Sequence, residues 1–120
     1  MTNQRRTAVA PLSGDGRNRS LAPYLRNRRR RLVVSAVDAA SESLELSALA
    51  RRVTAVETGV PASVVCEETA REVCLSLYNN HLPALCAQAV LKVRSRESVV
   101  VPGERFAEAV DYLRQSGRAE

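Results

Sequence analysis

The sequence predicts a mainly helical fold with one small β-hairpin and a further helix at the C-terminal end. Apolar residues recur at helical spacing in three successive segments between residues 24 and 89. Two short β-branched runs follow, and a last amphipathic segment comes after them. Three tyrosines and one phenylalanine are the only aromatic residues. The core must therefore consist of leucine, valine and alanine, which suits packed helices with a little sheet.

Residues 1–23 are predicted to form a flexible basic tail. The segment from Arg5 to Ser20 is polar, basic and glycine-containing, and it has too few apolar groups to offset the entropy lost on ordering. One interpretation is an arm that contacts nucleic acid. The alternative is a mobile leader with no partner.

The first helix is expected from Pro23 to Ala40, where Leu25, Leu32 and Val33 begin a helical repeat. Four consecutive arginines lie in it, and four consecutive residues point in four directions on a helix. At most two of them can approach one partner together. These arginines are Arg28, Arg29, Arg30 and Arg31.

The second helix is expected to begin at Ser47, because serine is a favoured N-cap. Gly59 followed by Pro61 predicts its end, since glycine suits the position just after a helix and proline cannot continue one.

The third helix is expected to open around Cys66 or Glu67 and to be kinked or divided at Pro83, whose ring clashes with the preceding turn. Its apolar repeat places one set of side chains inward: Leu77, Tyr78, Leu82 and Leu85. A second set then lies on or near the exposed side: Ser76, Asn79 and Asn80.

Residues 90–94 and 98–101 are short β-branched runs, and Ser95-Arg96-Glu97 lies between them. This pattern predicts a two-stranded hairpin, although no Asn-Gly or Asp-Gly turn accompanies it. Pro102-Gly103 ends the hairpin, and a helix from about Glu104 to Gln115 follows. The domain organisation predicted is a tail, a domain over residues 24–102 and a C-terminal helical segment over residues 103–120.

Three helices followed by a hairpin are the order of a winged helix-turn-helix domain, in which the third helix enters the major groove of DNA. The segment Ser76-Leu77-Tyr78-Asn79-Asn80-His81-Leu82-Pro83-Ala84-Leu85 resembles the S-L-Y-x-x-H-L-P-x-L signature of an uncharacterised haloarchaeal winged-helix family. Arg71 and the arginine-rich start of the first helix also resemble that family. The resemblance covers roughly residues 25–102 and implies a winged-helix fold and a regulatory role.

A more distant similarity, to the H-L-x-x-L-x-x-x-G-L-V pattern of ArsR-type repressors, is carried by His81-Leu82, Leu85 and Ala89-Val90-Leu91. The glycine expected before the hairpin is replaced by Gln88-Ala89, so the turn between helix and hairpin is expected to differ in shape. The chain is also basic, whereas halophile proteins are usually acidic.

The net charge of +5 and the 18 basic residues, of which Lys92 is the one lysine, favour a polyanionic partner. A coding bias toward arginine is the alternative. If the third helix reads double-stranded DNA, base contacts are expected from Ser76, Asn79 and Asn80, because asparagine can bond adenine in the major groove. Helix capping by Asn79 or Asn80 is the competing interpretation. Contacts to the DNA backbone are expected from Arg28, Arg29, Arg30, Arg31, Arg71, Arg94 and Arg96.

Other chemistry finds little support in the sequence. Cys66, Cys74 and Cys86 lack zinc-finger spacing and contain no C-x-x-C pair, so they are expected to be buried small hydrophobes, with a thiol or metal sensor as a weaker hypothesis. The lone His81 is expected to be structural.

We find no phosphate loop and no nucleophile elbow, which favours a protein that is not an enzyme and has no cofactor, metal or evident small-molecule ligand. No apolar run approaches a membrane span, and a cytoplasmic location is the default.

The last helix has few places to bury Phe106, Val110 and Leu113. They are expected either to pack on their own domain or to form the interface of a homodimer that matches two DNA half-sites. The function predicted is a DNA-binding transcription regulator. The alternative is a non-enzymatic protein-interaction adaptor on the same scaffold, because fold does not imply function.

Overall fold

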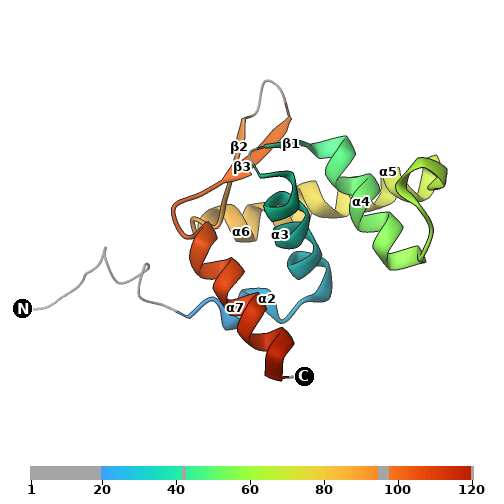
Figure 1. Cartoon of the computed structure of the whole chain (residues 1–120). Helices are drawn as coiled ribbons and strands as arrows, with labels where there is room; N and C mark the ends of the chain where they lie inside the picture. The colour runs from blue at the N-terminus through green and yellow to red at the C-terminus, as the bar shows by residue number, and fades with distance from the viewer. Residues whose placement is uncertain (1–19, 42, 95–97, 120) are drawn as a thin grey trace, which may run out of the picture.

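The computed structural model of the chain describes residues 20–41, 43–94 and 98–119, and of residues 117–119 it describes the backbone alone (Figure 1). The elements follow in this order: α2 (Ala22–Leu25), α3 (Arg28–Ala40), β1 (Leu44–Glu45), α4 (Leu46–Thr58), the short helix η2 (Ala62–Val64), α5 (Glu67–Ser76), the π-helical turn η3 (Leu77–His81), α6 (Leu82–Ala87), β2 (Leu91–Arg94), β3 (Val99–Pro102) and α7 (Phe106–Ala119). This is the predicted mainly helical fold with a small antiparallel sheet and a C-terminal helix.

The first predicted helix is divided in two. Asn27 lies in an extended conformation between α2 and α3, and its side-chain oxygen accepts a hydrogen bond from the backbone N–H of Arg30 at 3.1 Å. This bond caps α3 and satisfies one of the donors that every helix start leaves free. Leu21 is 3% exposed, so the folded part begins before the predicted tail ends at residue 23. The rest of that tail, residues 1–19, is outside the described residues.

The second helix, α4, begins one residue before Ser47, so the prediction of Ser47 as its N-cap is wrong. The N-cap is Glu45, which makes no capping bond through its side chain. Glu45 also belongs to strand β1, and the backbone N–H of Leu46 donates to the carbonyl of Ser98 at 2.7 Å. The sheet therefore sets where this helix starts. The predicted end is confirmed, because Gly59 follows Thr58 with a left-handed φ of 77°.

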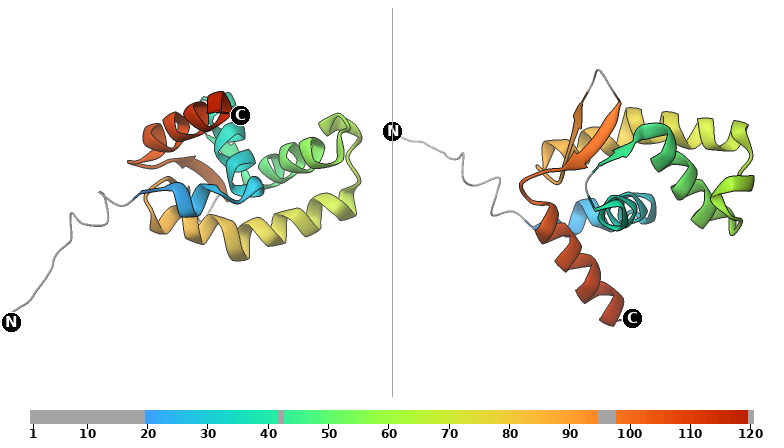
Figure 2. Two further views of the ribbon diagram at one scale, coloured as in Figure 1. Left: turned by 90° about the horizontal axis from the view of Figure 1, so that it is seen from below. Right: turned by 45° about the horizontal axis from the view of Figure 1, so that its top comes forward.

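The third helix begins at Glu67 with Cys66 as its N-cap, and the interruption predicted at Pro83 is a π-helical turn just before the proline and not a break in the helix. In this turn, η3, the N–H of Leu82 donates to the carbonyl of Leu77, five residues earlier. The wider turn brings Pro83 to the first turn of α6, where a proline needs no N–H donor. Figure 2 shows that α5, η3 and α6 remain one continuous rod along one side of the molecule.

The predicted hairpin is confirmed in β2 and β3, which pair antiparallel with Leu91 opposite Pro102 and Arg94 opposite Val99. The sequence did not predict the third strand, β1, which pairs with the other side of β3 through Leu44 and Val100. The sheet order is β1-β3-β2. The tip of the hairpin, with Arg96, lies outside the described residues.

Helix α3 forms the centre of the domain, with Val33, Val34 and Val37 fully buried. One side of it faces the α5–η3–α6 rod and the other side faces α7 (Figure 2). Val110 on α7 is 9% exposed, and Phe106 and Leu113 pack against the same core. Of the two interpretations of these three residues, packing on their own domain is therefore the one observed.

The described part of the chain has no helix with the length and apolar character needed to cross a membrane.

Candidate nucleic-acid interface

In the α5–η3–α6 rod, the exposed face of α5 and η3 carries polar and apolar side chains side by side. Arg71, Leu75, Tyr78 and Asn79 are all exposed, with Leu75 at 57% and Tyr78 at 60%. Steps of three and four residues bring them onto neighbouring positions of one helical face. We call these four residues the rod face.

Tyr78 was predicted to point inward, and that prediction is wrong. In a regular α-helix, residues 78, 82 and 85 would share one face. The wider turn of η3 instead aligns Leu77 with Leu82 and Leu85, which are 0%, 2% and 0% exposed. Tyr78 is rotated outward as a result, and Asn79 and Asn80 are exposed as predicted.

A hollow of about 390 Å³ lies between the rod and the hairpin. Tyr78 and Asn79 line it from η3, and Val93 lines it from β2. Leu82, Pro83 and Cys86 complete the lining, so its surface is mostly apolar. The hollow therefore continues the rod face toward the hairpin.

Lys92 and Arg94 are exposed on β2, where they alternate with the buried Leu91 and the half-buried Val93. Since successive side chains on a strand point to opposite faces, both cations lie on the side of the strand away from the hollow. Of the two arginines predicted for the hairpin, Arg94 is thus on the surface, and Arg96 is outside the described residues.

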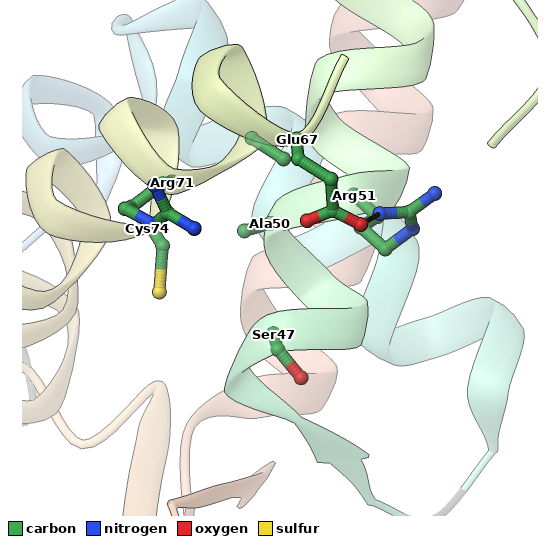
Figure 3. A pocket seen from close by; sticks show the side chains of 7 residues that line it. Ser47, Ala50, Arg51, Glu67, Arg71 and Cys74 are labelled. Carbon is green, nitrogen blue, oxygen red and sulfur yellow. Dashed lines mark hydrogen bonds and ion pairs between the residues drawn. The ribbon is translucent and has the colours of Figure 1, made fainter. Parts of the chain in front are cut away.

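A second hollow, of about 180 Å³, lies between α4 and α5. Figure 3 shows Arg71 and Cys74 on one side of it, and Ser47 and Arg51 from α4 on the other. Arg51 forms an ion pair with Glu67 at 2.8 Å, but Glu67 is 78% exposed, so this pair contributes little to stability. Arg71 belongs both to this hollow and to the rod face.

The start of α5 is acidic, with Glu67 and Glu68 in its first turn and Glu72 one turn later. Carboxylates near a helix N-terminus are favoured by the helix dipole. They also repel phosphate, so any DNA backbone that approaches this end of α5 must be held by the cations around it.

Three of the four arginines at the start of α3 bind groups inside the protein. Arg29 makes two bonds of 2.7 Å to the carboxylate of Glu57 and donates to the hydroxyl of Ser76 at 3.1 Å. Arg31 donates to the backbone carbonyls of Leu25 and Arg26. Arg28 is the exposed member of the run.

Arg30 donates from Nε to the Nδ1 atom of His81 at 3.0 Å. His81 is 5% exposed, so this contact lies in the interior of the domain. Burial lowers the pKa of His81, and the charges of Arg30 and Arg29 lower it further. The hydrogen bonds from Arg29 hold the pKa of Glu57 below its usual value, against the opposing effect of burial.

These contacts change the role of one predicted base-reading residue. Ser76 is half-buried and is turned toward Arg29 on α3. Asn79 and Asn80 keep the exposure that base reading requires. Leu75 was not among the predicted site residues, and its place at a helical spacing from Arg71 and Asn79 is the signal that could have found it.

The cysteines form no cluster. Cys66 is exposed, which corrects the expectation that all three are buried, while Cys74 and Cys86 are half-buried. Hydrogen bonds from Thr69 lower the pKa of Cys66, and burial raises the pKa of Cys86. Within residues 20–41, 43–94 and 98–119, no group of three histidine, cysteine or carboxylate side chains could hold a metal ion.

The helix order, the hairpin beside the third helix and the exposed rod face define a small domain of the winged-helix type. Residues 23–101 match the family described as a domain of unknown function (DUF7344), and the chain belongs to that family. Comparison with curated proteins gave no match, and comparison with solved structures gave none either.

Proposed function

We propose that the chain is a DNA-binding transcription regulator that holds the α5–η3 rod in the major groove. The observation that carries the proposal is the exposure of Arg71 and Asn79 on one face of the third helix of a helix-turn-helix. An arginine at this position suits phosphate or guanine, and an asparagine suits adenine. Under this proposal the chain catalyses no reaction, and it acts in the cytoplasm.

The hairpin supports the same proposal. Lys92 and Arg94 are exposed on β2, on the side of the strand away from the hollow, and cations on a wing suit phosphate contacts that position a protein without reading sequence. Arg28, at the start of α3, is a further exposed cation. We therefore propose base reading by Asn79 and Asn80, and phosphate contacts by Arg28, Arg71, Lys92 and Arg94.

We retain the homodimer as part of the proposal, because symmetric regulators bind paired half-sites. Val110 is packed within the chain, whereas Phe106 and Leu113 on the same helix are half-buried and keep some surface for such an interface. Sedimentation equilibrium with and without duplex measures the stoichiometry directly.

The alternative function is a protein-interaction adaptor, and one observation favours it. Leu75 and Tyr78 are large, mostly exposed apolar residues on the rod face, and acidic residues at the start of α5 accompany them. An apolar patch with charged neighbours is also typical of a docking surface for another protein. Binding of DNA at low salt discriminates between the two functions.

The test is to select a preferred duplex from a random pool and compare variants on it by fluorescence anisotropy. Arg71→Ala and Asn79→Ala should each weaken binding at least about fivefold, and Asn79→Ala should also relax the preference at one base pair. Arg114→Ala removes an exposed arginine from α7 and serves as the matched control. Equal affinities for all three variants and the original protein would count against the rod face as the DNA-binding surface.

A further inference from the structure

We propose that Leu75, Tyr78 and the hollow beside them bind the 5-methyl groups of thymine, so that the preferred site is rich in A·T pairs. This inference rests on the proposed DNA-binding function and names what the rod face reads. It concerns Leu75 and Tyr78, which the proposed base and phosphate contacts do not use.

The first observation is the exposure of apolar surface where a DNA reader usually carries polar groups. Leu75 is 57% exposed and Tyr78 is 60% exposed, one helical turn apart on the rod face. Thymine is the base that presents an apolar group in the major groove, and apolar side chains contact that methyl group. Contact between the two surfaces removes both from water, which is favourable.

The second observation is the composition of the hollow between the rod and β2. Its lining is mostly apolar, and Asn79 and Tyr78 bring an amide and a hydroxyl to it. An A·T pair offers a matching pattern in the major groove, namely the N7 acceptor and N6 donor of adenine and the methyl group of thymine. Asn79 would bond the adenine while the apolar lining receives the methyl group of the same or the next pair.

The third observation is the charge around the rod face. Glu68 and Glu72 are exposed on α5 near Leu75, and their charges oppose phosphate binding at this point. The cations that suit phosphate are Arg71 on the same face and Lys92 and Arg94 on the hairpin. Because the hairpin cations lie apart from Leu75 and Tyr78, the apolar part of the rod face is left to contact base edges.

The test uses the selected duplex made twice, once with thymidine and once with deoxyuridine at every A·T pair. Deoxyuridine keeps the base pairing and lacks the methyl group alone. Affinity should fall about fourfold for each methyl group that the protein buries, measured by anisotropy at one salt concentration. Leu75→Ala and Tyr78→Ala should bring the ratio of the two affinities, that for the thymidine duplex over that for the deoxyuridine duplex, toward one. Leu75→Met, which keeps an apolar side chain, should preserve it.

Val56→Ala is the matched control, because it trims a valine that is 53% exposed on α4 and should leave the ratio unchanged. Far-ultraviolet circular dichroism shows that each variant is folded. Equal affinity for the two duplexes would overturn the methyl inference while DNA binding stands. A ratio that Leu75→Ala and Tyr78→Ala leave unchanged would also overturn it. Failure to bind either duplex at low salt would overturn the proposed function itself, and the inference with it.

Discussion

The four consecutive arginines of α3 are divided between the interior and the surface. Arg29 holds Glu57 on α4 and Ser76 on α5, so one guanidinium joins three helices. Arg30 holds His81 at the end of η3. The arginine run therefore fixes the position of η3, on which Asn79 and Asn80 are presented, and leaves Arg28 exposed. Composition alone could not reveal this division, because it depends on which helices pack against α3.

The burial of His81, together with the charge of the neighbouring Arg30, makes the fold sensitive to acid. The folded protein holds the pKa of His81 below that of an unfolded histidine, about 6.5. The unfolded chain therefore binds more protons, and stability is lost as pH falls from about 6.5 through the folded pKa. The slope cannot exceed ~1.4 kcal/mol per pH unit for one proton. Glu57, whose pKa is also lowered, adds a loss in the same direction at lower pH.

The measurement is urea unfolding between pH 7.5 and 5, a range in which histidines titrate. His81→Gln removes the titrating ring and should flatten the profile in this range, with Asn80→Gln as a control that leaves it unchanged. A profile for His81→Gln as steep as the original would mean that another group controls the acid response.

At the scale of elements, the turn between α6 and β2 shows how the chain manages without the glycine that was expected before the hairpin. Ala89 has a φ of 62°, a left-handed conformation that costs about 1–2 kcal/mol in a residue with a Cβ atom. Its carbonyl accepts the N–H of Arg105 at 2.7 Å, which ties the turn to the start of α7. The glycine expected here is absent from the sequence, but the backbone still adopts the shape that glycine prefers.

Ala89→Gly should therefore raise the free energy of unfolding by about 0.5–1 kcal/mol, measured by urea denaturation. Gly103→Ala should lower the free energy of unfolding. The Cβ atom that this substitution adds would lie 2.5 Å from the carbonyl oxygen of Ala89, and such overpacking costs about 1–3 kcal/mol. A loss of stability in Ala89→Gly would show that the left-handed turn is not a source of strain.

The elements that the sequence predicted are those with a helical repeat over many residues or with a glycine or proline that marks a boundary. Helical repeats placed α3 and α4 in outline, Gly59 marked the end of α4, and Pro83 marked the place near which the third helix changes to a π turn. The strand β1 has two residues, too few to show any alternation, and its pairing with β3 moved the start of α4 away from Ser47. The π turn was equally hidden, since one extra residue in a helical turn changes which side chains face outward. This is why Tyr78 was assigned to the core.

At the scale of the whole molecule, order of elements and net charge were readable from the sequence, and the arrangement of charge was not. The chain has a net charge of +5, but the start of α5 is acidic and much of the arginine run is bound internally. The cations left on the described surface beside the rod are few, so we expect modest electrostatic binding combined with specific base contacts.

The most direct test of DNA binding through the rod face and hairpin is a titration of labelled duplex at several salt concentrations. The logarithm of the affinity should fall linearly with the logarithm of the salt concentration, with a slope of about −0.9 for each phosphate contacted. Changing Lys92 and Arg94 together to alanine should make that slope shallower by about 2, while Arg114→Ala leaves it unchanged. No binding at the lowest salt concentration, or a slope that the double variant leaves unaltered, would contradict the account.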